Sequence, residues 1–403
     1  MRLHFKDELY DAQLLRAVGH ASYQGAELGE CLATVAAVRE LDADGWYDAW
    51  MKTARRVHAL ADESLAAGQT VSARGAYLRA SNYYRTAYVF IFEKPLDERL
   101  RTAYDGQSEA FRRAAALFRP AFEFVSVPYE SGHLPAYVAK IDDRRRPLMI
   151  LVGGYDSTME ESYFFNVQAA LDRGYHCLCF DGPGQGEMLV KRATPFRADW
   201  DAVVRPVVDH AITRPEVDPD NIVLMGLSFG GYLAARAAAG EPRLRACIVD
   251  PGQLDIHRAI VDRLPSPLRG YVGSPSGLKR AILRSIFKSV LGNPSKGWAL
   301  RRALLVHDLP TVEAYLDLMR SYTLEGFAER ISCPTLVCDA EDDDIAAFAR
   351  TFFERLTCPK AYLRFLGSEG AGAHCEMGAR ALFHQKVFAW LQGLGGALAA
   401  TGG

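Results

Sequence analysis

The chain has 403 residues, of which 49 % are apolar and 24 % are charged, and its formal net charge is −2. That length is enough to bury one large core together with an accessory domain. The near-neutral charge, without a long basic run, argues against a nucleic-acid-binding protein, and no uncharged apolar stretch of the sequence is long enough to cross a membrane.

Cysteine spacing and the first residues indicate the compartment in which the protein works. Eight cysteines are scattered along the chain, and Cys177 and Cys179 alternate along one predicted strand instead of forming a Cys-x-x-Cys pair. Residues 1–8 contain no apolar core of a signal peptide. We therefore expect a cytoplasmic protein with reduced thiols and no metal ion.

Residues 1–120 are helical in pattern, with few breakers, and predict an N-terminal helical lid domain. The aromatic residues of segment 77–90 recur on helical turns, which more often indicates core packing than substrate contact. Tyr83 and Tyr84 nevertheless point in different directions on a helix, so we expect one of them to face the pocket as a substrate-binding residue.

Strands first appear after residue 121 and then alternate with helices, which is typical of a mostly parallel sheet with helices on both faces. The sequence thus predicts an α/β fold whose core consists of residues 121–251 and 331–403. Residues 252–330 contain several prolines among helical stretches and predict a helical insertion, or cap, before the penultimate strand. Strands are expected at residues 122–127, 134–139, 147–152, 176–180, 221–225, 334–338 and 361–366.

Residues 226–230 have the sequence Gly-Leu-Ser-Phe-Gly and lie between an apolar strand-like run and an alanine-rich helix-like run. This is the G-x-S-x-G nucleophile elbow in its strand–turn–helix context, where glycines permit a tight turn and the serine hydroxyl is exposed at the end of the sheet. Ser228 is therefore the predicted nucleophile. The alternative is a glycine-rich turn whose serine only caps the following helix.

A serine nucleophile needs a histidine base and an orienting acid. The acidic loop 339–344 follows a predicted strand. We choose Asp343 as the acid because it lies three residues after the small Ala340, and Asp342 is the main rival. His374 lies in a glycine-rich loop after the last predicted strand, whereas His384 falls within the final helix. The chain order Ser, Asp, His is that of α/β-hydrolases.

Attack on a carbonyl produces an oxyanion, which needs backbone donors. We expect one donor in the N–H of Phe229, directly after the nucleophile. The other is expected in the glycine-containing loop after strand 147–152, where Tyr155 is the first choice and Gly154 the second. The glycine-rich loop 181–187 lacks the Lys-Ser/Thr ending of a phosphate loop, so we assign no cofactor to the chain.

The elbow and several other segments, in their order along the chain, resemble the 2,6-dihydroxypseudooxynicotine hydrolase family. These other segments are residues 80–85, 153–161, 181–186, 322–328 and 373–375. The chain is also similar to fungal hydrolases that shorten polyketide pigment precursors and to a wider group of FrsA-like esterases. The resemblance implies an α/β-hydrolase fold, a helical domain closing over the site, and hydrolysis of a C–C bond in a ketone or β-diketone without metal or organic cofactor.

By this resemblance the family's triad corresponds to Ser228, Asp343 and His374, whereas residues 251–255 give no clear match to the additional acid of some members. The leading interpretation is a serine-dependent hydrolase that cleaves a C–C bond next to a carbonyl in an aromatic or polyketide-like ketone. An esterase, thioesterase or acyl-transferring cyclase with the same triad is the alternative, and a non-catalytic binding protein is a third. We expect a small-molecule substrate and neither nucleic acid nor membrane as partner, and we leave a homodimer open.

Overall fold

The structure is a computed structural model that describes residues 2–274, 276–346 and 348–399. In these residues an eight-stranded sheet has the order β1-β2-β4-β3-β5-β6-β7-β8. β2 pairs antiparallel with β1 and with β4, and the other neighbouring strands run parallel. The strands are β1 Glu123–Tyr129, β2 Gly132–Ala139, β3 Arg146–Val152, β4 His176–Phe180, β5 Val217–Leu227, β6 Ala246–Asp250, β7 Thr335–Ala340 and β8 Lys360–Phe365.

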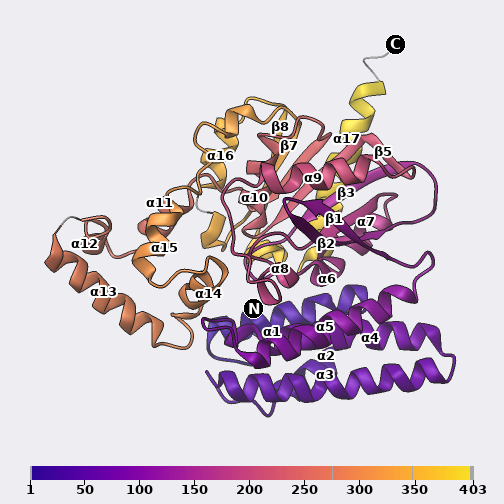
Figure 1. Cartoon of the computed structure of the whole chain (residues 1–403), viewed down its shortest axis with the longest axis horizontal. Helices are drawn as coiled ribbons and strands as arrows, with labels where there is room; N and C mark the ends of the chain where they lie inside the picture. The colour runs from indigo at the N-terminus through magenta and orange to yellow at the C-terminus, as the bar shows by residue number, and fades with distance from the viewer. Residues whose placement is uncertain (1, 275, 347, 400–403) are drawn as a thin grey trace.

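Helices of the core flank this sheet and bury its central strands (Figure 1). Every residue of β4, β6 and β7 is buried, which explains why these strands read as nearly continuous apolar runs instead of alternating ones. The predicted α/β-hydrolase fold is therefore confirmed. The core helices are α6 Met159–Ser162, α7 Gln168–Leu171, α8 Gly186–Val190, α9 Asp201–Ile212, α10 Gly230–Ala238, α16 Ala349–Arg355 and α17 Arg380–Ala399.

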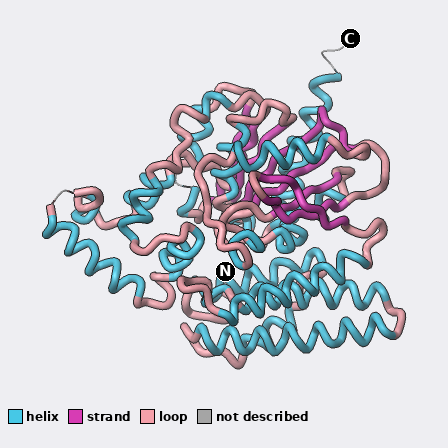
Figure 2. Tube along the Cα trace, viewed as in Figure 1, coloured by secondary structure: helices cyan, strands magenta, loops and turns pink. Residues whose placement is uncertain are grey.

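The chain begins with a helical region that forms a layer along one side of the core (Figures 1 and 2). Its own aromatic core includes Trp46, which is fully buried and donates from Nε1 to the carbonyl of Thr86 at 2.8 Å. Tyr10 stacks on Phe90 at 3.8 Å between ring centroids and contacts Trp46 edge-on. The helices are α1 Glu8–Gly19, α2 Leu28–Val35, α3 Ala43–Ala66, α4 Thr70–Ala87 and α5 Glu98–Ala116.

A second group of helices lies between β6 and β7, where the sequence predicted an insertion before the penultimate strand. Figure 1 shows that α12 and α13 extend away from the sheet, whereas α14 returns to the N-terminal helices. There Trp298 Nε1 donates to the carbonyl of Val89 at 2.8 Å, so the insertion contacts the N-terminal region directly. The helices are α11 Ile256–Asp262, α12 Ser266–Arg269, α13 Gly277–Leu291, α14 Trp298–Val306 and α15 Val312–Met319.

Membrane crossing requires a long apolar helix. Across the ranges described above, none of the helices combines the length and apolar character that a membrane span needs.

The aromatic core of the N-terminal region gives a stability prediction. Replacing Trp46 by Ala leaves a large cavity and removes the indole donor to the carbonyl of Thr86, so we expect the free energy of unfolding to fall by about 3–5 kcal/mol in urea denaturation. Leu60→Ala on the same helix is the control, because that side chain is 42 % exposed, and its effect should stay within about 0.5 kcal/mol. Equal effects of the two substitutions would contradict the packing described here.

Candidate active site

Ser228 lies on a strained turn between β5 and α10. Its φ angle is +60°, which a non-glycine residue rarely adopts, and its N–H donates to the carbonyl of Asp250 at 2.6 Å. A Cβ at Gly226 would lie 1.9 Å from the carbonyl oxygen of Gly230, and one at Gly230 would lie 2.3 Å from that of Val152. Both glycines are therefore required by close backbone contacts, as the elbow motif predicts.

The structure brings Ser228, His374 and Asp343 together. His374 Nε2 lies 2.8 Å from Ser228 Oγ, and His374 Nδ1 lies 2.7 Å from Asp343 Oδ2. The other carboxylate oxygen of Asp343 accepts the N–H of Ile345 at 2.9 Å. Because a carboxylate only accepts, Nδ1 carries the hydrogen and Nε2 is free to accept the serine proton. Asp342 is exposed, and its backbone N–H donates to the carbonyl of Gly372.

The pKa shifts of Asp343 and His374 agree with the hydrogen bond between these two residues. Burial opposes the charged form of His374, but the charge of Asp343 and its hydrogen bond outweigh this and raise the pKa of His374 above its ordinary value. Burial likewise opposes charging Asp343, whose side chain is 2 % exposed, yet His374 lowers the pKa of this carboxyl. The carboxylate of Asp343 therefore favours the charged imidazolium form of His374.

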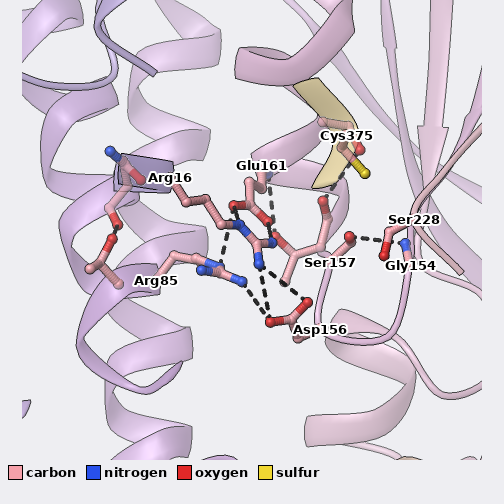
Figure 3. A network of polar contacts seen from close by, with 12 residues as sticks. Arg16, Arg85, Gly154, Asp156, Ser157, Glu161, Ser228 and Cys375 are labelled. Atoms are coloured by element: carbon pink, nitrogen blue, oxygen red, sulfur yellow. Dashed lines mark hydrogen bonds and ion pairs between the residues drawn. The ribbon is translucent and has the colours of Figure 1, made fainter. Parts of the chain in front are cut away.

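The loop after β3 lies against the nucleophile. A Cβ at Gly154 would lie 3.0 Å from Ser228 Oγ, so only glycine leaves room at this point. The N–H of Gly154 donates to Ser157 Oγ at 2.9 Å, as Figure 3 shows, and is thus committed within the loop. Within the described residues the N–H groups of Tyr155 and Phe229 have no protein acceptor, so these two amides remain the predicted oxyanion donors.

Two further side chains, which the sequence did not single out, brace this loop and the elbow. Gln185 Nε2 donates to the carbonyls of Gly153 and Gly154 at 2.6 and 3.2 Å. Gln253 Nε2 donates to the carbonyl of Ser228 at 2.8 Å. The loop 181–187 therefore holds, through Gln185, the backbone that faces Ser228.

A mostly apolar cavity of about 260 Å³ contains Ser228 and His374 in its wall. Its other walls come from three separate parts of the chain: the N-terminal helix α1, the insertion, and the loops of the core. The residues that complete the lining are Leu9, Ala12, Gln13, Leu15, Arg16, Asp156, Ser157, Phe165, Leu227, Trp298, Arg302, Ile345, Ala373, Cys375 and Met377.

A second cavity of about 580 Å³ lies between the N-terminal residues and the loop that carries His374. Its lining includes the charged residues Arg2 and Asp342. Four residues line both cavities, so the two spaces adjoin at this wall. The shared residues are Ala12, Leu15, Ala373 and Met377.

Tyr83 and Tyr84 lie elsewhere, and the prediction that one of them faces the pocket is corrected by the structure. Tyr83 is fully buried in the N-terminal region, where its hydroxyl donates to Glu30 at 2.8 Å and accepts the N–H of Glu27 at 2.9 Å. Tyr84 packs against Gly106 of α5. Neither side chain lines the cavity at Ser228, because both sides of this part of α4 are covered by other helices.

A buried cluster of charges lies beside the cavity, and sequence analysis missed it. Arg16 donates to both carboxylate oxygens of Glu161, at 2.8 and 2.6 Å, and lies 3.2 Å from Asp156 (Figure 3). Arg85 donates to Asp156 at 2.9 Å, and Arg302 lies 3.1 Å from the same carboxylate. Burial alone would raise the pKa of Glu161, but Arg16 and Arg85 outweigh it and lower that pKa to about 2.

Metal binding would need a cluster of suitable donor side chains. In the part of the chain that the structure describes, no group of three or more His, Cys, Asp or Glu side chains is arranged to hold a metal ion.

Comparison with known proteins agrees with this geometry. The sequence model of the Alpha/beta hydrolase family matches residues 149–383. Hydrolase LUC6 of Fusarium sp. is 33 % identical and 20-hydroxy-prefusarin hydrolase FUS2 of Gibberella moniliformis is 34 % identical, each alignment covering 96 % of both chains. The crystal structure of the 2,6-dihydroxy-pseudo-oxynicotine hydrolase superposes with a TM-score of 0.74 at 23 % identity and covers 93 % of this chain and 94 % of that one.

The acid of the triad can be tested with a matched pair of variants. Asp343→Asn should lower kcat/KM for 4-nitrophenyl acetate by about 10²- to 10⁴-fold, because the imidazole loses the partner that fixes its tautomer. Asp342→Asn removes the same charge one residue away and should leave kcat/KM close to that of the unaltered protein. A larger loss in the Asp342 variant would move the acid to that position.

The pKa of His374 gives a second test, which can be made by turnover and by direct titration. Because the pKa of His374 is raised, kcat/KM should fall with decreasing pH at a higher pH than an ordinary imidazole would give, since only the neutral ring can accept the proton of Ser228. In Asp343→Asn the attraction is lost while burial still opposes the charge, so the midpoint should shift to lower pH. Titration of the histidines by NMR, with His374→Gln to assign the signal, measures the shift directly, and an unchanged midpoint would refute the coupling.

Proposed function

The chain belongs to the alpha/beta hydrolase family, and we propose that it is a serine-dependent hydrolase that cleaves a C–C bond next to a carbonyl in an aromatic or polyketide-like ketone. The observation that carries this proposal is the continuous set of hydrogen bonds from Ser228 through His374 to Asp343 at the wall of a mostly apolar cavity. Apolar walls suit a bulky ketone, and the serine and histidine supply a nucleophile and its base.

In the proposed reaction Ser228 Oγ attacks the carbonyl carbon while His374 Nε2 takes its proton. The backbone N–H groups of Phe229 and Tyr155 stabilise the oxyanion. When the intermediate collapses, the C–C bond breaks, and the departing carbon takes the electron pair as an enolate or related stabilised carbanion. His374 returns the proton to this fragment, and water then releases the acid from the acyl-enzyme.

The shape of the site supports a large substrate and a closed reaction chamber. We propose that residues 1–120 and 252–330 act as two lids over the core, because Gln13 of α1 and Trp298 of α14 both line the cavity at Ser228. The adjoining cavity of about 580 Å³ offers room for the remainder of an extended substrate. Exclusion of water strengthens each electrostatic contact at the reacting atoms.

The relatives support a small-molecule substrate. Hydrolases LUC6 and FUS2 match this chain over nearly its whole length, so the lids as well as the core are included in the alignment. FUS2 is named for 20-hydroxy-prefusarin. From these names we take only the class of a small organic substrate.

Incubation with 1-phenyl-1,3-butanedione in ¹⁸O-labelled water tests the proposed reaction. We expect mass spectrometry to detect an acyl group on the protein, and a carboxylic acid and a methyl ketone as products, with one ¹⁸O atom incorporated into the acid. Ser228→Ala should lower kcat/KM by about 10⁴-fold or more and abolish the acyl adduct, because the residues of a triad act as a unit.

An ester probe, 4-nitrophenyl acetate, is the control for a working triad. Hydrolysis of the ester with no cleavage of several aromatic and aliphatic β-diketones would replace the C–C proposal by an esterase. Folded Ser228→Ala protein that turns over either compound at the normal rate would refute the role of the serine.

A further inference from the structure

The charge cluster beside the cavity carries more positive than negative charge. The guanidinium groups of Arg16, Arg85 and Arg302 surround the carboxylates of Asp156 and Glu161. The nearby ring of His20 adds no charge near neutral pH, because burial lowers its pKa below the ordinary value despite the contact with Glu161. The cluster therefore has one positive charge in excess, next to a mostly apolar cavity.

Arg302 is the member of the cluster with the fewest partners. Arg16 donates to both oxygens of Glu161, and Arg85 contacts Asp156 and Glu161. Among the described residues, Arg302 forms one ion pair, with Asp156, and its buried Nε has no hydrogen-bond partner. A guanidinium offers five N–H donors, so most of those of Arg302 have no protein acceptor among the described residues.

Arg302 lies in the wall of the cavity that contains Ser228. The Cζ atom of Arg302 lies 3.9 Å from the ring centroid of Trp298 and 5.6 Å from that of Tyr155. These two rings therefore restrict the position of the guanidinium. The side chain is 15 % exposed, and Arg302 lines the same cavity as Ser228. Burial lowers the pKa of Arg302 although Asp156 opposes the shift, so a second anionic partner would favour its charged form.

We propose that Arg302 binds an anionic oxygen of the substrate, namely the second carbonyl oxygen of a β-dicarbonyl compound, which becomes an enolate when the C–C bond breaks. This inference rests on the proposed function and adds to it a residue that binds the substrate. Asp156 and Trp298 act as positioning residues that hold the guanidinium beside the cavity. The charge-assisted hydrogen bonds to the enolate form fully only as the bond breaks, which is the kind of contact that accelerates a reaction.

The proposed cleavage needs only the substrate and water as reactants. Ser228 Oγ forms a bond to the attacked carbon and gives its proton to His374 Nε2. The C–C bond then breaks, its electron pair passes into the departing fragment, and the negative charge is concentrated on the oxygen at Arg302. The proton on His374 moves to the carbon of this enolate and gives a ketone, and water hydrolyses the acyl-enzyme to an acid.

Binding to the Ser228→Ala protein tests the inference without requiring turnover. Isothermal titration calorimetry compares 4-phenylbutanoate, a stable anionic probe, with the neutral 4-phenylbutanamide of similar size. We expect the anion to bind about tenfold more tightly or better, because a hydrogen bond to a charged group is worth at least that factor. Equal or weaker binding of the anion would overturn the proposal, and this comparison leaves Arg302 unchanged.

A set of variants then assigns the preference to one residue. Ser228→Ala/Arg302→Gln should lose the preference for the anion, and Ser228→Ala/Arg302→Lys should keep part of it. Ser228→Ala/Arg280→Gln is the matched control, because Arg280 is an exposed arginine of α13 in the same insertion. Circular dichroism checks that each variant is folded. An undiminished preference in a folded Arg302→Gln variant would refute the assignment.

Turnover distinguishes an enolate that forms during the reaction from a carboxylate that merely binds. Arg302→Gln should lower kcat/KM for 1-phenyl-1,3-butanedione at least about tenfold more than it lowers kcat/KM for 4-nitrophenyl acetate, because only the diketone releases an enolate. Equal losses for the two substrates would overturn the enolate assignment. Cleavage of the diketone by the unaltered protein, combined with equal binding of the two phenylbutanoyl probes, would refute only the role of Arg302 and leave the proposed function standing.

Discussion

Asp156 connects three parts of the protein that are far apart in the sequence. Its carboxylate pairs with Arg16 and Arg85 of the N-terminal helices and with Arg302 of the insertion, while its backbone belongs to the loop beside Ser228. Removing one member of a buried ion network leaves the other charges unpaired, which typically costs about 3–5 kcal/mol. This carboxylate thus fixes both helical regions relative to the nucleophile, so the shape of the cavity depends on it.

The sheet imposes the second constraint on the site. A Cβ at Gly231 would lie 2.1 Å from the carbonyl oxygen of Pro251, so the start of α10 packs directly on the end of β6. Ser228 therefore emerges where β5 and β6 end, and the loops after β7 and β8 supply Asp343 and His374 at the same edge. Because all three side chains lie on turns or loops that start from this edge of the sheet, the sheet brings them together without help from the two helical regions.

Local patterns predicted the parts of the site that lie within one strand, turn or loop. The elbow around Ser228 and the glycine-rich loop around His374 have short signatures, and the choice of Asp343 over Asp342 agrees with the distances. The role of Arg302 could not be predicted in this way, because its contact with Asp156 joins residues from distant segments and has no periodic signal. The expectation for Tyr83 failed since helical periodicity shows that a residue is covered, not which element covers it.

The positive charge of Arg302 does more than the triad to decide which kind of bond is cleaved. Ser228, His374 and Asp343 would attack an ester and a ketone in the same way, and the difference lies in the group that leaves. An alkoxide needs only a proton, which His374 supplies, whereas a carbon leaving group must spread its electrons onto an oxygen that something stabilises. An excess positive charge in a mostly apolar cavity, held in place before the substrate arrives, meets this second requirement, since a preorganised charge costs no reorganisation during the reaction. Arg302 therefore supplies, from the insertion, the electrostatic contribution that an α/β-hydrolase core without this insertion would lack.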